Sequence, residues 1–164
     1  MAQVISLFTC PAIGRPMQDH TFVRALAGFG LEGDRYALGQ GSHSHRLPLV
    51  PRHISIIASE AIEAANAELV QRGLLPFTPR ENRRNIVVEG VDVYELVGQK
   101  FRIGAVWLRG SEPTRPCHIP SAVAGKSHFR ETYQDRGGIR AEVLSDGIIV
   151  VGDTVATGLP LVDC

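Results

Sequence analysis

Short stretches rich in apolar residues recur along the chain and predict β-strands. They lie at residues 3–8, 52–57, 85–90, 100–104 and 105–110, and apolar and polar residues alternate partly in the first and clearly in the last two. The C-terminal part, 139–157, predicts three more strands, separated by an Asp-Gly turn and a Gly-Asp turn. Residues 11–48 contain nine glycines and prolines and little periodicity, so we expect irregular chain there.

Two segments carry a helical pattern. The first, at about 60–72, is rich in alanine and has acidic residues in its first turn. Ser59 is expected to cap this helix and Gly73 to end it. The second, 121–134, has apolar residues at helical spacing and is expected to be broken at Gly125.

The balance of strands and helices indicates the fold class. A parallel βαβ sheet would need helices that alternate regularly with the strands, and these do not. The pattern therefore predicts a mainly β fold, a strongly bent and mostly antiparallel β-barrel with a few peripheral helices. The length fits a single domain over residues 1–164, large enough to bury its own core without a disulfide or a structural metal.

Composition narrows the classes of partner and the location. Acidic and basic residues balance at 17 each and no basic run is present, which argues against nucleic-acid binding through bulk charge. No apolar stretch approaches the ~20 residues that a membrane helix needs. The N-terminus has no basic leader, and three scattered cysteines are too few for a disulfide framework, so we expect a cytoplasmic protein.

Metal centres built from several protein ligands are not expected. The chain has no four-ligand spacing for zinc, and three cysteines cannot hold a four-thiolate iron–sulfur cluster. His43 and His45 form a His-x-His, but they lie in a loop of glycine and serine where solvent-exposed histidines are typical.

Arginine is the dominant basic residue, with fifteen arginines against two lysines. This excess reflects either codon bias in a GC-rich genome or a need for planar donors that bind oxyanions. The segment DRGGIR at 135–140 favours the second interpretation, because Gly137 and Gly138 let the backbone approach a ligand between Arg136 and Arg140. A tight bend at the start of a strand would explain the two glycines equally well.

Cys117, in the segment EPTRPCHIP at 112–120, is the candidate for chemistry. A neighbouring cation favours the thiolate, which is the reactive and metal-binding form of cysteine. Pro116 favours extended chain, in which the side chains of Arg115 and Cys117 share one face and His118 lies on the other. The alternative is a buried cysteine with a packing role, since free cysteine is among the most buried residue types.

Four blocks in order make the chain resemble the MOSC domain family, the module named after the C-terminal domain of molybdenum-cofactor sulfurase. They are GLEGDRYALG at 30–39, RHISIIASEAIE at 52–63, ENRRNIVVEGVDVYELVGQKFRIG at 81–104 with EPTRPC at 112–117, and RGGIRAEVLSDGIIVVGD at 136–153. The sequence departs from the family pattern at Tyr36, where histidine is common, and at Arg80, where glycine is common.

The resemblance implies a role for particular residues. Cys117 would ligate the molybdenum of the pterin cofactor, or carry sulfur as a persulfide, and soft thiolate sulfur suits both tasks. The residues implied to bind the molybdenum cofactor (molybdopterin) are Asp34, Asn82, Arg115, Arg136, Gly137, Gly138 and Arg140. Pyridoxal phosphate and iron–sulfur domains belong to larger relatives and do not fit in 164 residues.

Three functions are therefore carried forward. The first is a molybdenum-cofactor protein that reduces N-hydroxylated compounds with electrons from a separate electron-transfer protein. The second is a carrier of sulfur or cofactor that is served by a separate sulfur donor and catalyses nothing alone. The third is a barrel that binds another anion and in which Cys117 is structural.

Overall fold

The structure, a computed structural model, describes residues 1–158. Its strands are β1 (Gln3–Thr9), β2 (Gln18–His20), β3 (Phe22–Leu26), β4 (Gly30–Leu31), β5 (Ile54–Ala58), β6 (Ile86–Glu89), β7 (Lys100–Ile103), β8 (Val106–Pro113), β9 (Ile139–Val143), β10 (Gly147–Val150) and β11 (Val155–Ala156). Its helices are α1 (Ser59–Gln71), α2 (Ile119–Ala124) and α3 (Phe129–Thr132), with 3₁₀ turns η1 (Arg35–Leu38), η2 (Arg80–Asn82) and η3 (Val93–Leu96).

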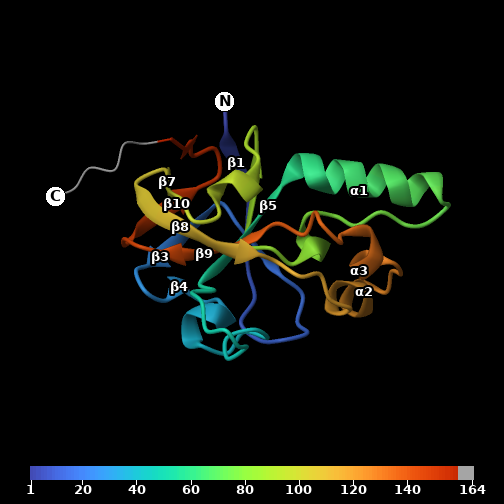
Figure 1. Cartoon of the computed structure of the whole chain (residues 1–164). Helices are drawn as coiled ribbons and strands as arrows, with labels where there is room; N and C mark the ends of the chain where they lie inside the picture. The colour runs from blue at the N-terminus through green and yellow to red at the C-terminus, as the bar shows by residue number, and fades with distance from the viewer. Residues whose placement is uncertain (159–164) are drawn as a thin grey trace.

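Eight strands form one curled sheet in the order β11-β7-β8-β9-β5-β6-β1-β2, and β10, β3 and β4 form a smaller sheet (Figure 1). Neighbouring strands are antiparallel except for the parallel pair β5 and β6. The large sheet curls into a half-barrel, which confirms the predicted mainly β, bent and mostly antiparallel fold. The single domain over 1–164 stays a prediction.

The first strand closes a seam with the last part of the described chain. The Val4 amide donates to the Asp153 carbonyl at 2.9 Å, and the Val155 amide donates to the Ala2 carbonyl at 3.0 Å. These bonds satisfy the edge of β1 that β2 leaves free, because β2 pairs only with Leu7–Thr9. The curl therefore removes an edge strand that could otherwise pair with another chain.

Two apolar clusters hold the layers together. The inner cluster fills the concave side of the sheet and takes residues from most strands, including Ile54, Phe101 and Ile139. The second lies between the sheet and the helices, where Ile62 and Leu69 of α1 pack with β-strand residues such as Ile57. Fully burying a side chain of this size contributes about 1.5–3 kcal/mol, so each cluster is a large part of the stability.

The predicted helices are found with small differences. Helix α1 spans Ser59–Gln71, but Ser59 lies inside it and the N-cap is Ala58, which makes no side-chain cap bond. The predicted break at Gly125 is confirmed, because α2 ends there with Gly125 at φ 66°. None of the helices in residues 1–158 is both long and apolar enough to cross a membrane.

The expectation of irregular chain over 11–48 is wrong in part. This segment contains β2, β3, β4 and η1. Strand β3 escaped the sequence pattern because it pairs with β10, more than 120 residues away, in the register Val23 with Ile149. The three C-terminal strands exist as predicted, but they pair with β8 and β5, with β3, and with β7 rather than with each other.

Candidate functional site

The charge of the buried residues is strongly unbalanced. The buried arginines are Arg35, Arg52, Arg83, Arg84 and Arg140. Asp34 is the one buried acidic residue in the part of the chain that the structure describes. Since an unpaired buried charge is costly, this imbalance needs either a partner in the fold or a ligand from outside.

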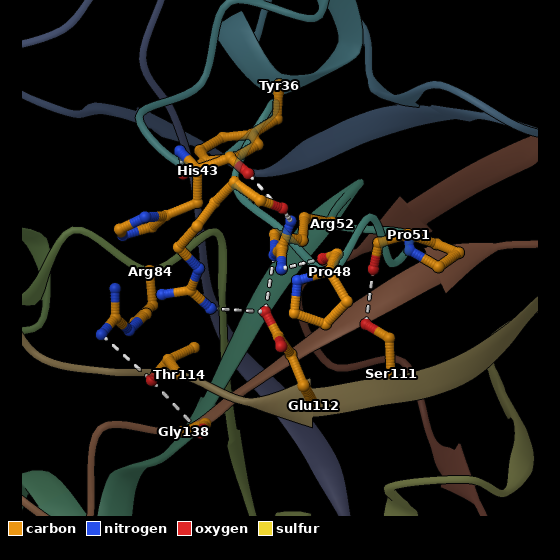
Figure 2. A network of polar contacts seen from close by, with 11 residues as sticks. Tyr36, His43, Pro48, Pro51, Arg52, Arg84, Ser111, Glu112, Thr114 and Gly138 are labelled. Carbon is orange, nitrogen blue, oxygen red and sulfur yellow. Dashed lines mark hydrogen bonds and ion pairs between the residues drawn. The ribbon is translucent and has the colours of Figure 1, made fainter.

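Arg52 is the arginine whose charge is best compensated. Its Nε donates to the Glu112 carboxylate at 2.6 Å, and its two Nη atoms donate to the carbonyls of His43, Arg46 and Pro48 at 2.9–3.0 Å (Figure 2). Arg46 binds the same Glu112 oxygen at 3.1 Å. One carboxylate therefore serves two guanidinium groups, and a positive charge remains.

Arg84 has hydrogen bonds but no carboxylate. It lies just before β6, where its Nε donates to the Gly137 carbonyl at 2.7 Å and its Nη2 to the Thr114 hydroxyl at 3.2 Å. Burial and then the nearby Arg140 lower the pKa of Arg84 to about 10, while the charge of Cys117 raises it. Arg84 is thus a buried arginine close enough to Cys117 for the two charges to interact.

Arg140, like Arg35, is buried without a carboxylate partner among the residues described. It lies on β9 between Glu112 of β8 and Ser55 of β5 in the sheet register. Its side chain is buried and makes no hydrogen bond or ion pair with the residues described, and its guanidinium carbon lies 4.5 Å from the centre of the Tyr36 ring. Burial lowers the pKa of Arg140.

The nitrogens of Arg140 border open space. The fully enclosed side-chain atoms without a partner, within residues 1–158, are Arg35 Nε, Asn82 Oδ1 and the Tyr133 hydroxyl, and no Arg140 atom is among them. A guanidinium that is buried, unpaired and still open on one side is arranged to receive an anion.

His43 belongs to this group, contrary to the expectation of a solvent-exposed histidine. It is half-buried, whereas His45 two residues on is exposed. Burial lowers the pKa of His43 to about 4, and the charges of the arginine cluster add to this shift. We use the name arginine cluster for Arg46, Arg52, Arg84 and Arg140, the four residues whose charges lower the pKa of His43.

Cys117 lies on the segment between β8 and α2, two residues before the first residue of α2. Its side chain is partly buried, and it is a free cysteine. Arg115 is exposed and lines an outer cleft of about 530 Å³ together with Tyr94, Thr114, Arg130 and Gln134. His118 is exposed as well.

The comparison with known proteins decides the family. The sequence model of the MOSC domain matches residues 34–156, three quarters of the chain. The chain belongs to the MOSC domain family. No functionally curated protein matches it.

Solved structures share the fold of this MOSC domain. The YUAD protein from Bacillus subtilis has a TM-score of 0.77 at 19% identity, with 94% of each chain covered. YiiM from Geobacillus stearothermophilus has a TM-score of 0.67 at 16% identity, covering 95% of this chain and 74% of that one. YiiM from Escherichia coli has a TM-score of 0.64 at 18% identity, covering 98% and 72%.

The two glycines of the MOSC domain's 136–140 segment support the arginines. The Gly137 carbonyl receives Arg84 Nε, and a Cβ at this residue would lie 2.9 Å from the Thr114 hydroxyl. Gly138 has φ 89°, and a Cβ there would lie 2.2 Å from the Ile56 carbonyl oxygen. Both glycines are therefore required by close packing behind the arginines.

The other residues implied by the family resemblance have contacts of their own. The Arg136 guanidinium pairs with Glu68 on α1. Asp34 accepts from the Cys10 amide at 2.9 Å, the Tyr36 amide at 3.1 Å and Asn85 Nδ2 at 3.2 Å, so it holds η1 in place. Asn82 donates to the Thr78 carbonyl at 3.0 Å.

The two departures from the family pattern lie in different surroundings. Tyr36 is part of the site, because its ring lies against Arg140 and its hydroxyl accepts from the His43 amide at 3.2 Å. Arg80 is exposed and pairs with Asp19 on β2. Only the change at Tyr36 therefore alters the lining of the arginine cluster in this MOSC domain.

Sequence reasoning named Arg140 and Cys117 as candidates, but it did not name Arg84 and it took His43 to be solvent-exposed. A signal for Arg84 was present: the adjacent arginines Arg83 and Arg84 are separated from the buried strand β6 only by Asn85. Two charged residues next to a buried strand are expected to be buried along with the strand. No comparable local signal marks His43.

Proposed function

We propose that this MOSC protein binds the molybdenum cofactor, with the Cys117 thiolate as the molybdenum ligand and with Arg84 and Arg140 holding the anionic part of the pterin. The observation that carries the proposal is that Arg84 and Arg140, two of the buried arginines without a carboxylate partner, repel each other, and that Arg84 also interacts with Cys117. Planar guanidinium groups match phosphate oxygens, and a soft thiolate suits molybdenum.

The chain's other residues would position these groups. Gly137 and Thr114 hold the Arg84 guanidinium through its Nε and Nη2, which leaves its Nη1 for a ligand. Tyr36 stacks on Arg140 and fixes the plane of its donors. Asp34 acts through η1 rather than by contact with the cofactor, because its carboxylate already accepts three hydrogen bonds.

We further propose that the loaded protein reduces N-hydroxylated compounds in the cytoplasm. The bound cofactor supplies the two-electron chemistry, and the electrons come from a separate electron-transfer protein. The outer cleft of about 530 Å³ gives the substrate a place beside Thr114 and Arg115. Arg115 and Tyr94 are the residues of this cleft that would orient a polar substrate by hydrogen bonding.

A second candidate, a sulfur carrier, is favoured by the partial exposure of Cys117. A thiol at the surface of a site can exchange sulfur with a donor protein, whereas a fully buried one cannot. In this function Cys117 would hold sulfur as a persulfide, and the arginine cluster would stabilise the anionic persulfide.

Molybdenum content tests the proposal. The wild type, Cys117→Ser and Cys10→Ser are made in a host that synthesises the cofactor, and molybdenum and persulfide are measured per chain. Cys10 is a suitable control, because it is fully buried and donates to the Ala12 carbonyl at 2.8 Å, a bond that serine can also make.

The expected result is loss of molybdenum in Cys117→Ser alone, because a hard serine oxygen cannot replace the thiolate. Wild-type loading in Cys117→Ser would contradict the ligand assignment. Persulfide without molybdenum would favour the carrier. The absence of both molybdenum and persulfide would favour the anion-binding barrel with a structural cysteine. A reductase assay with a chemical electron donor then separates an enzyme from a cofactor carrier.

A further inference from the structure

His43 is held so that its ring joins the arginine cluster. It lies on the chain between η1 and β5, where its amide donates to the Tyr36 hydroxyl at 3.2 Å and its carbonyl accepts from Arg52 Nη1 at 3.0 Å. These two bonds fix the backbone on both sides of the residue. Figure 2 shows its ring on the same side as the Arg84 guanidinium.

The groups that act on this ring come from every neighbouring element. Arg140 lies on β9, Arg84 lies before β6, and Arg46 and Arg52 lie on the same connection as His43. Glu112 of β8 is the acid bound to two of these arginines, Arg46 and Arg52. Burial first and the arginine charges second therefore lower the pKa of His43 and keep its imidazole neutral while the arginines have no anion.

We propose that His43 takes up a proton from solvent when a doubly charged oxyanion binds between Arg84 and Arg140, and that it then donates a hydrogen bond to this anion. This inference rests on the proposed function, because it takes these two arginines as the anion site. The site would consequently select phosphomonoester-like dianions over monoanions. A dianion neutralises both guanidinium charges, whereas a monoanion leaves one that continues to repel the imidazolium.

The size of the effect follows from linkage between proton and anion. In the free protein the pKa of His43 lies at about 4, against an ordinary value of 6.5. If the dianion restores the ordinary value, its affinity at about pH 5.5 exceeds that at about pH 7.5 by about tenfold, because only the complex binds the extra proton. A monoanion is expected to show only a fraction of this dependence.

Sulfate is the probe, since it stays doubly charged across this pH range while phosphate does not. Sulfate and nitrate are titrated calorimetrically into cofactor-free wild type, His43→Gln and His45→Gln at both pH values. The carbon-bound protons of the imidazoles are followed by NMR with and without sulfate. His45→Gln is the matched control, because His45 is exposed on the same loop.

We expect about tenfold tighter sulfate binding at the lower pH in the wild type and in His45→Gln, and a nearly flat profile in His43→Gln. The His43 resonance should titrate at higher pH when sulfate is present. Equal pH dependence in His43→Gln and the wild type, or equal dependence for nitrate and sulfate, overturns the inference about His43.

The same experiment separates this inference from the proposed function. Arg84→Gln and Arg140→Gln should each weaken sulfate binding at both pH values. If neither does, or if sulfate does not bind, the anion site itself is wrong and both proposals fail. If both do but His43→Gln keeps the pH dependence, only the role of His43 is lost. Circular dichroism of each variant confirms that it is folded.

Discussion

Replacing Arg140 by methionine should stabilise the protein when no anion is bound. Methionine has a similar length and can fill the space of the arginine stem, but it brings no charge into the buried region. The variant removes a positive group that has no ion pair among the residues described and that repels Arg84. The same change should weaken anion binding, so stability and function move in opposite directions.

The magnitude can be worked from Arg84. Its pKa is about 10 instead of 12.5, and since each unit is about 1.4 kcal/mol, keeping this side chain charged and buried at neutral pH costs about 3 kcal/mol. Arg140→Met removes the part of this cost that comes from repulsion by Arg140. It also removes the cost of burying the Arg140 charge itself. It loses the stacking on Tyr36, about 0.5–2 kcal/mol. A net gain of about 1–2 kcal/mol is expected, in line with other replacements of buried charge.

Urea and thermal unfolding at neutral pH provide the assay. The gain corresponds to an increase in Tm of about 2–8 °C for a chain of this size. Sulfate should stabilise the wild type more than Arg140→Met, because the wild type binds it more tightly. Arg109→Met is the control, since Arg109 is exposed on β8 and should change stability little. A loss of 1 kcal/mol or more in anion-free Arg140→Met would refute the view that this charge is uncompensated.

Three further predictions concern other parts of the site. The free energy of unfolding should fall by about 1–2 kcal/mol as the pH drops from 6.5 towards 4. The unfolded chain binds a proton at His43 in this range, whereas the lowered pKa of the half-buried His43 keeps the folded protein from doing so. Urea titrations should show a smaller drop in His43→Gln. Gly138→Ala should cost about 3 kcal/mol or more, since a Cβ would collide with the Ile56 carbonyl oxygen. Gly28→Ala is the control for backbone strain, because Gly28 has φ 79° and open space around it. Equal losses of stability in the two variants would contradict the collision at Gly138. Iodoacetamide should label Cys117 in the native protein and Cys10 only after unfolding, because Cys10 is buried. Mass spectrometry in a Cys164→Ser background reads the labelling. Labelling of Cys10 before Cys117 would contradict the burial of Cys10.

The fold was predictable from the sequence as far as local patterns determine it. Short apolar runs rich in β-branched residues located β5, β6 and β9 within a few residues, because strands that are buried on both faces need such residues along most of their length. The partners of these strands were not predictable. An Asp-Gly turn after β9 suggests a hairpin, yet β10 pairs with β3, since the curl of the large sheet brings distant segments together.

The candidate site shows the same division. Arg140 could be proposed as a candidate because two glycines beside it indicate a close approach of the backbone, and these glycines do pack tightly in the structure. Arg84 and His43 could not be assigned, because their surroundings are made by tertiary contacts. The burial of His43 depends on Tyr36 and Arg52, and a glycine- and serine-rich loop gives no hint of these bonds.

The seam between β1 and residues 152–155 has a consequence for synthesis on the ribosome. Strand β1 is made first, but two of its backbone partners, Asp153 and Val155, lie near the end of the described chain. The sheet therefore cannot close while these residues are still inside the exit tunnel, and this part of the β1 edge stays unpaired until they emerge. Such long-range pairing slows folding and exposes the nascent strand to aggregation. A chaperone that binds β1 before residues 152–155 emerge would thus protect the strand while its edge is unpaired.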